Sequence, residues 1–366
     1  MKFVKATEED STIWDQFVSN SQYPHYMQSF SWGKFKEKEG WEPAFFMAMD
    51  YGIIKGIALI LSKSLPVIKK SIYYLPRGPV VDPDDSKTLL FLLQNLVRHI
   101  SENNGIFLRA DPYLSKSKAY DSLFKDAGFR KLPKEWSYWN APRFVFWLKL
   151  DVGSDGILKK MAKKKRYEIR SATKKGIRFI RGDISDIQDF HALMIETADR
   201  KQIGVHNSDY YSNLLSAFKG SPKAQLFLAK YKDKTVAAGI SLIYGKRAWL
   251  MHIASSTKNT HLPSSRALQW EMILWAIENG CDLYDFRGTA VDDPPDPDNP
   301  GYGVYKFKKS FGPEYIRTAG YYDFIGNKLF YSFFSIAEHY LLPLFVDGAM
   351  KISHLWLSLK RKLNES

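Results

Sequence analysis

The amino-acid sequence contains the same order of predicted secondary-structure elements twice, and this internal repeat limits the possible folds more than any other feature. The first copy covers residues 44–112 and the second covers residues 224–288. In each copy, three apolar runs separated by short turns precede a stretch with apolar residues at helical spacing and one further apolar run. We therefore expect two mixed α/β layers, each built from strand, strand, strand, helix and strand.

Glycines mark equivalent points in the two copies. Gly56 in KGIALI matches Gly239 in AGISLI, and Gly105, which follows the first predicted helix, matches Gly280 after the second. A glycine directly after a periodic apolar stretch is typical of a helix C-terminus. One more helix is predicted ahead of each copy, at residues 12–19 and 187–200.

Two domains are expected because the 366 residues of the chain exceed the ~250 to 300 residues that a single hydrophobic core usually serves. The apolar run FVFWLKL ends at Leu150, and the turn rich in Gly, Ser and Asp that follows it is typical of a domain boundary. The sequence predicts a first domain over residues 1–150, a second over 151–324 and a hydrophobic, then basic, helical tail over 325–366.

Positive charge is concentrated in one segment. The chain has 53 Lys and Arg against 39 Asp and Glu, and this net charge of +14 favours polyanionic partners such as nucleic acid, pyrophosphates or an anionic membrane surface. Lys159–Arg178 contains ten basic residues and one acid, Glu168, and its apolar residues fall near one side, which predicts an amphipathic helix. A solvated basic face and a phosphate-binding face both fit this pattern. Tyr167 is its one aromatic residue, so base stacking is not expected.

Several features bear on the compartment. Cys281 is the one cysteine, which excludes an intramolecular disulfide and favours a reducing compartment. The acidic N-terminal residues do not resemble a signal peptide. The most apolar stretch, Leu329–Val346, contains Glu338 and Pro343, so no transmembrane helix is expected. We expect Leu329–Phe345 to pack on the protein and Met350–Leu363, which ends in a basic cluster, to lie on a membrane surface.

Common catalytic and cofactor motifs are absent from the sequence. It has no HExxH, GxSxG, GxxxxGK[ST] or GxGxxG motif, which argues against zinc hydrolases, kinases and dehydrogenases. The proline-rich acidic loop VDDPPDPDNPG reads as a rigid surface loop, and we expect neither a metal nor a cofactor. HLPSSR precedes the second predicted helix where a glycine-rich turn would be needed to hold the pyrophosphate of acetyl-CoA.

Seven motifs in order resemble the FemABX family of peptidoglycan aminoacyltransferases, which build the interpeptide bridge from aminoacyl-tRNA. The resemblance covers nearly the whole chain and follows the shorter branch, which lacks a coiled-coil arm. Its most diagnostic motifs are the last two. The motifs are QSFSWGKFKEKEGWEP, YLPRGPVVD, IFLRADP, ILKKMAKKKRYEIRSATKKGI, TADRKQIGVHNSDYYSNLL, LYDFRG and VYKFKKSFGPEY.

The resemblance implies a tandem of acetyltransferase-like (GNAT-type) α/β domains with mixed sheets. It implies aminoacyl-tRNA as donor, and lipid II or UDP-MurNAc-pentapeptide as acceptor, bound in a cleft. A cytoplasmic protein, peripheral at the inner face of the plasma membrane, fits these partners. By similarity, Lys36 would contact the diphosphate of the precursor, Tyr211 would line the cleft and Lys308 would stabilise negative charge at the acyl-transfer centre.

Other candidate site residues have more than one interpretation. Asn207 and His252 stand where one branch of the family carries an arginine and a tyrosine, so substrate contact there would use different groups. Arg287 fits either a structural ion pair or a phosphate contact. Asp111 and Asp285 lie at strand ends where a carboxylate could accept a proton, although a turn cap ahead of Pro112 explains Asp111 equally well.

Three functions are compatible with these residues. The first is aminoacyl transfer from tRNA to the stem-peptide amine of a peptidoglycan precursor. The second is a non-catalytic module that retains the cleft and binds a lipid-linked or tRNA partner. The third is acyl-CoA-dependent N-acylation, which depends on analogy of fold alone.

Overall fold

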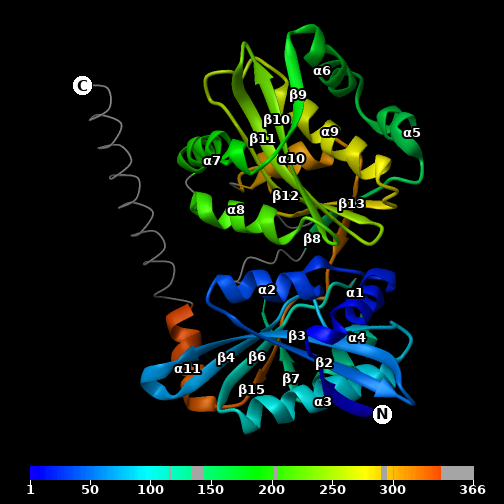
Figure 1. The fold of residues 1–366 in the computed structure, drawn as a ribbon, viewed down its shortest axis with the longest axis vertical. Coiled ribbons are helices and arrows are strands. Elements are labelled where there is room, and N and C mark those ends of the chain that lie inside the picture. The colour runs from blue at the N-terminus through cyan, green and yellow to red at the C-terminus, as the bar shows by residue number, and fades with distance from the viewer. Residues whose placement is uncertain (115–116, 134–143, 202–203, 290–294, 300, 339–366) are drawn as a thin grey trace.

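The computed structural model consists of two α/β domains, one stacked on the other (Figure 1). It describes residues 1–366 except 115–116, 134–143, 202–203, 290–294, 300 and 339–366. Each domain contains one mixed sheet, flanked by helices. The expected tandem α/β architecture is confirmed.

The first sheet has β4 and β6 as its parallel pair. In spatial order its strands are β1 (Lys2–Lys5), β2 (Glu42–Asp50), β3 (Ile53–Leu65), β4 (Lys70–Leu75), β6 (Gly105–Ala110), β15 (Tyr322–Ile325) and β7 (Phe129–Lys131), with β5 (Val80–Val81) paired to β3. The helices of this domain are α1 (Ser11–Asn20), α2 (Phe30–Lys38), α3 (Ser86–Glu102), α4 (Lys118–Asp126) and α11 (Lys328–Ile336).

The second sheet has β12 and β13 as its parallel pair. Its strands are, in spatial order, β14 (Glu314–Arg317), β8 (Phe144–Lys149), β13 (Leu283–Gly288), β12 (Arg247–Ser255), β11 (Lys234–Tyr244), β10 (Lys223–Tyr231) and β9 (Ile177–Gly182). The helices are α5 (Gly153–Lys160), α6 (Lys163–Lys174), α7 (Ile187–Lys201), α8 (Ser208–Ala217), α9 (Ser264–Glu278) and α10 (Tyr302–Lys309).

Gly56 and Gly239 have the same structural role in the two domains. A Cβ atom on Gly56 would come within 2.8 Å of Leu92 on α3, and one on Gly239 within 3.0 Å of Met272 on α9. Both contacts are tighter than normal packing allows, so each glycine lets the crossover helix approach its sheet closely. The predicted repeat of three strands, helix and strand is confirmed as β2, β3, β4, α3, β6 and β10, β11, β12, α9, β13.

Each sheet contains a strand that the expected boundaries place outside its domain. The chain reaches the second sheet by Phe144, because β8 pairs with β13 and β14. It returns to the first sheet at Tyr322, where β15 lies between β6 and β7. Residues 144–149 were expected before the boundary at Leu150 but belong to the second sheet, because backbone pairing, and not the nearby Gly/Ser/Asp turn, decides which domain they complete.

One of the hydrophobic clusters spans both domains. It contains Trp14 and Phe35 from the first domain and Phe190 and Trp249 from the second, all buried. Because the apolar surfaces of both domains meet here, the polar groups at the same interface are held by rigid packing.

The predicted basic helix is interrupted. Its residues divide between α5, α6 and the start of β9, where Arg178 lies. Met161 is extended, with φ −79° and ψ 149°, and its side chain is buried. The Arg166 guanidinium donates to the carbonyl oxygens of Leu158, Lys159 and Met161 at 3.3, 3.3 and 2.8 Å. The sequence was wrong about one continuous helix, because burial of Met161 and capping by Arg166 stabilise a break.

The start of the tail packs on the first sheet. Tyr331 and Phe334 of α11 contact the Phe107 ring, with centroid distances of 5.6 and 4.8 Å. The packing expected for Leu329–Phe345 is confirmed for one face of α11, and the predicted membrane segment Met350–Leu363 lies outside the described residues. None of the helices in the described part of the chain combines the length and apolar character that a bilayer-spanning segment needs.

Candidate active site between the two domains

Lys308 is buried near the C-terminal end of α10, with 7% of its surface exposed. Its Nζ atom donates hydrogen bonds to the carbonyl oxygens of Gly288, at 2.8 Å, and of Arg287, at 3.4 Å. An ammonium group has three N–H donors, so one remains for a ligand. Burial, followed by the charge of Arg287, lowers the pKa of Lys308 to about 7. A lysine with this pKa can both donate and accept a proton near neutral pH.

Asp285 on β13 joins Lys308 to the first domain. Its carboxylate accepts hydrogen bonds from the Tyr113 hydroxyl, from Trp147 Nε1 at 3.3 Å and from the backbone N–H of Arg287 at 2.5 Å. Burial raises the pKa of Asp285, while its charge partly offsets the lowering of the Lys308 pKa. With three donors engaged, Asp285 is placed to hold the site together.

Arg287 lies in the middle of the site. Its φ of +60° is unusual for a residue other than glycine and is the kind of backbone strain that clusters at functional sites. Within the described residues its guanidinium pairs with no carboxylate, and it donates to the Met251 carbonyl oxygen at 3.3 Å. Burial, followed by the Arg287 charge, lowers the pKa of His252 to about 3. Of the two interpretations of Arg287, the described ion pairs support the phosphate contact.

The first domain contains a matching arrangement. Arg77 has φ +58°, and its backbone N–H donates to Asp111 Oδ1 at 2.7 Å. Its Nε lies 3.3 Å from Asp111 Oδ2. Burial raises the pKa of Asp111, and the charge of Arg77 opposes that shift. Both carboxylate oxygens face Arg77, which agrees with the turn-bracing interpretation, so a role for Asp111 as general base stays a prediction.

His25 is a site residue that the sequence did not single out. It is 4% exposed, and its ring centroid lies 4.6 Å from both Tyr26 and Tyr113 and 5.3 Å from Trp249. Burial, and then the charges of three arginines, lower its pKa well below the usual value; these arginines are Arg77, Arg287 and Arg247. A neutral histidine surrounded by cations marks a region of positive potential. The available signal was the position of His25 just ahead of the QSFSWGKF motif.

Lys36 lies on α2 at the other end of the interface. Its Nζ is 5.7 Å from the Trp32 ring centroid and 5.8 Å from that of Phe35. Burial lowers the pKa of Lys36, the charge of Glu39 opposes that shift, and the charge of Lys63 adds to it. The His206 ring stacks on Tyr210 at 3.8 Å, and the charge of Lys36 adds to partial burial in lowering the pKa of His206. This end therefore offers a cation beside aromatic faces, which suits a diphosphate linked to a sugar or base.

Tyr211, Asn207 and His252, which the sequence predicts to bind substrate, differ in burial and in their contacts. Tyr211 is fully buried, with the Phe190 and His252 rings at 4.9 and 5.1 Å, so its ring packs in the hydrophobic cluster that joins the domains, and burial raises the pKa of Tyr211 to about 12. Asn207 caps α8 by accepting a hydrogen bond from the Tyr210 N–H at 3.0 Å. His252 is half-buried between Tyr211 and Arg287. The structure thus brings Lys36, His252, Arg287 and Lys308 into one continuous interface, and direct substrate contact by Asn207 and Tyr211 stays a prediction.

The N-termini of the two crossover helices differ in their capping. Asp85 caps α3 by accepting a hydrogen bond from the Thr88 N–H at 2.9 Å. In the first turn of α9, Arg266 is ion-paired with Glu168 of α6. Helix N-termini bind phosphate when their N–H groups are accessible; a carboxylate of the chain occupies this position in α3, whereas no side chain caps α9.

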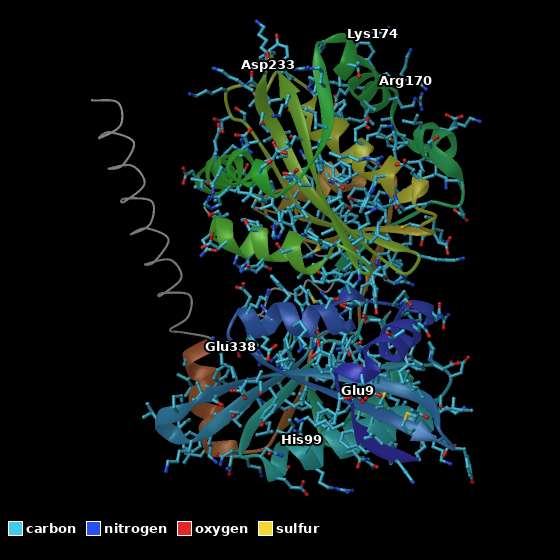
Figure 2. All side chains as sticks on the ribbon, viewed as in Figure 1. Glu9, His99, Arg170, Lys174, Asp233 and Glu338 are labelled. Atoms are coloured by element: carbon cyan, nitrogen blue, oxygen red, sulfur yellow. The ribbon has the colours of Figure 1, made fainter. Side chains whose placement is uncertain are left out.

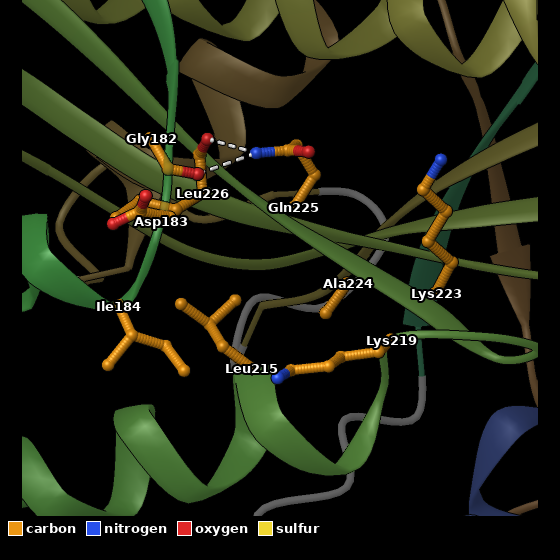
Figure 3. A pocket seen from close by; sticks show the side chains of 9 residues that line it. All are labelled: Gly182, Asp183, Ile184, Leu215, Lys219, Lys223, Ala224, Gln225 and Leu226. Atoms are coloured by element: carbon orange, nitrogen blue, oxygen red, sulfur yellow. Dashed lines mark hydrogen bonds between the residues drawn. The ribbon is translucent and has the colours of Figure 1, made fainter.

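A separate hollow lies on the second domain (Figure 3). It has a volume of about 500 Å³ and lies beside β10 and α8. The Gln225 amide donates to the carbonyl oxygens of Gly182 and Leu226, at 2.8 and 3.0 Å. Its lining includes Lys219, Lys223 and Asp183 but no buried cluster of polar groups comparable to the domain interface. No described group of His, Cys, Asp and Glu is arranged to hold a metal ion.

Comparison with known proteins supports the architecture. The chain is 23% identical to the Lipid II:glycine glycyltransferase of Staphylococcus aureus (strain MRSA252), over 95% of this chain and 97% of that protein. The crystal structure of FemX superposes with a TM-score of 0.82 at 21% identity, covering 92% of this chain and 100% of that one. A tandem GNAT protein from the clavulanic acid biosynthesis pathway superposes with a TM-score of 0.55 at 10% identity, covering 89% and 98%.

These likenesses confirm the tandem acetyltransferase-like fold. The model of the FemAB family matches residues 10–232 and 221–339, which together take in both domains and α11. On this match the chain belongs to the FemAB family.

Proposed function

We propose that the protein transfers an amino acid from aminoacyl-tRNA to the stem-peptide amine of a peptidoglycan precursor. The observation that carries this proposal is the buried Lys308, whose pKa of about 7 and remaining N–H donor suit acyl transfer at the domain interface. Membership of the FemAB family, and the name of the S. aureus relative, support a peptidoglycan precursor as acceptor.

The reaction needs little beyond a positioned proton donor. The neutral amine of the stem peptide attacks the ester carbonyl carbon, and the Lys308 ammonium donates a hydrogen bond to the developing oxyanion. As the new C–N bond forms and the C–O bond breaks, Lys308 gives its proton to the departing ribose oxygen. The proton lost by the amine then returns to Lys308. No covalent enzyme intermediate is required.

The precursor fits the interface with its diphosphate between Lys36 and Arg287. Neither takes part in an ion pair among the described residues, although the charge of Glu39 acts on Lys36. The aromatic rings beside Lys36 provide apolar contact for the attached sugar.

The donor is best explained as an RNA. The Asp85 carboxylate occupies the N-terminus of α3, and the segment HLPSSR, which contains no glycine, leads into α9 where a coenzyme pyrophosphate would bind. Figure 2 shows Arg170 and Lys174 at the outer end of the second domain, away from the domain interface. A small cofactor cannot reach both regions, whereas a folded RNA can contact the basic face of α5 and α6 while its acceptor end enters the site.

Transfer and salt dependence test this proposal together. Charged tRNA and a diphosphate-linked precursor are incubated with the protein, and the product is identified by mass. We expect one aminoacyl increment, and tRNA binding whose log K falls by about 0.7 to 0.9 per neutralised phosphate per log unit of salt. Transfer from acetyl-CoA would contradict the proposed donor. Binding of tRNA and precursor without any product would identify a non-catalytic binding module instead.

A further inference from the structure

One face of α11 is apolar and open to solvent. Leu329, Phe333 and Ile336 are 64%, 64% and 56% exposed. Their spacing of four and three residues places them on the same side of the helix. Isolated exposed apolar residues are common on proteins, but a continuous stripe along one helix is typical of an interaction surface.

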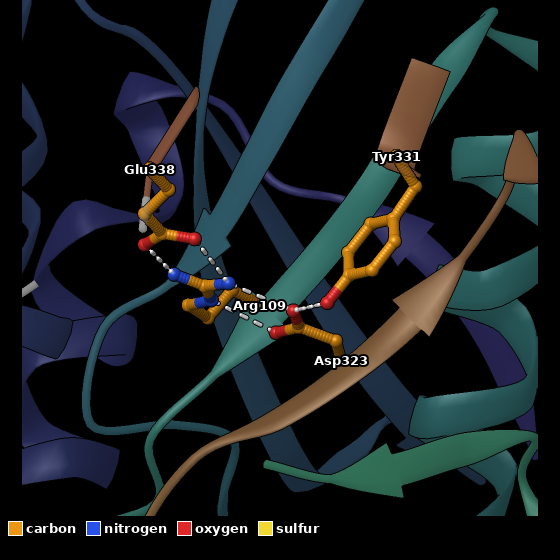
Figure 4. Close-up of polar contacts among 4 residues, drawn as sticks. All are labelled: Arg109, Asp323, Tyr331 and Glu338. Atoms are coloured by element: carbon orange, nitrogen blue, oxygen red, sulfur yellow. Dashed lines mark hydrogen bonds and ion pairs between the residues drawn. The ribbon is translucent and has the colours of Figure 1, made fainter. Parts of the chain in front are cut away.

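The exposed face is held rigidly. Asn327 caps α11 by accepting a hydrogen bond from the Phe330 N–H at 3.1 Å. After the helix, the Glu338 carboxylate pairs with buried Arg109, which also forms two 2.9 Å hydrogen bonds with Asp323 (Figure 4). Tyr331 donates to Asp323 at 2.7 Å. Because side-chain contacts fix both ends of α11, the apolar stripe is a permanent feature of the folded domain.

A neighbouring turn extends the surface. The turn between β3 and β4 exposes Val67 to 97% and Ile68 to 37%. It adjoins α11, because Lys70 at the start of β4 lies 5.6 Å from the Phe330 ring centroid (Figure 1). Leu65 packs in the same small apolar cluster as Phe330.

The charged groups around this surface are mostly positive. Lys328 and Lys69 are exposed, and Arg130 lies over the Tyr331 ring at 4.7 Å. Lys63 on β3 lies 5.7 Å from the Trp41 ring centroid. The carboxylate of Glu42, beside Ser62, is an acid at this edge. Apolar residues surrounded by lysines match the composition of proteins that rest in the headgroup region of an anionic bilayer.

The surface adjoins the candidate active site. Lys63 Nζ lies 5.7 Å from the Trp41 ring centroid, and the backbone N–H of Trp41 donates to the Lys36 carbonyl oxygen at 3.0 Å, so the positive strip reaches the end of α2 that carries Lys36. A diphosphate bound at Lys36 therefore lies close to the surface that would meet the lipid. This relationship suits a precursor whose diphosphate is attached to a membrane lipid.

We propose that α11 and the β3–β4 turn dock the protein on an anionic lipid bilayer, and that the acceptor is the lipid-linked form of the precursor. The proposal rests on the proposed function only in its second part. Docking by the described residues 65–70 and 328–336 does not require that the tail beyond Glu338 takes part.

Vesicle binding tests the docking surface. The full chain is sedimented with vesicles of equal parts phosphatidylcholine and phosphatidylglycerol. Leu329→Ser combined with Phe333→Ser should lower the partition coefficient at least about tenfold, since each exposed apolar side chain of this size contributes a large part of interfacial binding. The matched control is Tyr51→Ser with Ile53→Ser, which removes side chains of 100% and 60% exposure from the β2–β3 turn. The control should bind as the unchanged protein does.

A second double variant tests how much the positive charges contribute to vesicle binding. Lys69→Gln with Lys328→Gln should weaken binding to the anionic vesicles by roughly tenfold to thirtyfold, and should leave the weak binding to pure phosphatidylcholine unchanged. Equal partitioning of the unchanged protein and the serine double variant would overturn the docking surface. If the serine variant instead converts a dimer to a monomer with unaltered vesicle binding, the face serves self-association.

Transfer assays separate this inference from the proposed function. The serine double variant should retain transfer to a soluble nucleotide-linked precursor and lose about tenfold or more of its transfer to a lipid-linked precursor embedded in vesicles. Equal loss on both substrates would overturn the link to the lipid form. If the unchanged protein transfers to neither substrate, the proposed function fails, while the vesicle result still decides the docking surface.

Discussion

The hydroxyl group of Tyr113, which follows β6 of the first domain, donates a hydrogen bond to the buried carboxylate of Asp285 on β13 of the second. This bond crosses the interface beside Arg287, whose backbone N–H also donates to Asp285 and whose carbonyl oxygen accepts from Lys308. It couples the relative position of the domains to the geometry of the candidate active site.

Removing that hydroxyl should destabilise the protein. Tyr113→Phe leaves a buried carboxylate oxygen with one donor fewer, which commonly lowers the free energy of unfolding by about 1 to 3 kcal/mol. Urea unfolding followed by tryptophan fluorescence measures the change. Tyr167→Phe, at an exposed ring on α6, is the control and should have no effect. An unaltered midpoint for Tyr113→Phe would show that the interface does not depend on this bond.

Replacing Lys308 should affect turnover more than binding. If its N–H stabilises the oxyanion, Lys308→Met should lower kcat by about 10² to 10³ with a much smaller change in KM. Lys306→Met on the same helix removes an exposed lysine that lies over Tyr302, and it should retain full activity. A Lys308→Met protein with normal kcat would exclude Lys308 from the chemical step.

The same lysine should make stability depend on pH. Its pKa is about 7 in the folded protein against 10.5 as the reference value, so between these pH values the unfolded chain binds more protons. The free energy of unfolding should therefore rise with pH across that range because of this group, and below pH 7 the buried charge is most unfavourable. Relative to the unchanged protein, Lys308→Met should gain most stability at pH 6 and least at pH 10. Urea unfolding measures this difference in free energy at both pH values. An equal difference at pH 6 and pH 10 would contradict the burial of a charged Lys308.

Arg109 should be critical for the anchoring of α11. Arg109→Met leaves the carboxylates of Asp323 and Glu338 buried without their cation, and loss of one partner from such a cluster commonly costs about 3 to 5 kcal/mol. Arg130→Met removes an exposed arginine that contacts Tyr331 and should cost far less. Thermal unfolding compares the two variants. A Tm for Arg109→Met equal to that of Arg130→Met would show that the cluster is not stabilising.

The internal repeat of strands and helix could be predicted from the sequence because local residue patterns specify it. At Gly56 and Gly239 a side chain would crowd the crossover helix, which explains why a glycine stands at the same place in both copies. The sheets to which β8 and β15 belong could not be predicted from the sequence, since an apolar strand pattern does not specify which sheet the strand completes. The break at Met161 was also missed, because it depends on a guanidinium five residues later along the chain.

The candidate site was partly predictable. The family resemblance identified Lys36 and Lys308, and the structure places both at one interface. It did not identify His25 or Tyr113, whose roles arise from contacts with Trp249 and Asp285 on the other domain. Such long-range contacts leave no local pattern, whereas motifs near a single strand or helix do.

The placement of β8 and β15 has a consequence for synthesis on the ribosome. The gap between β6 and β7 is filled by Tyr322–Ile325, so the first domain must wait for almost the entire chain to emerge before its sheet is complete. Until then two strand edges of that nascent domain remain unpaired, and such edges can join those of other chains. Separately expressed halves divided at Leu150 would each carry a strand that belongs to the other. They should become soluble only when produced together in one cell.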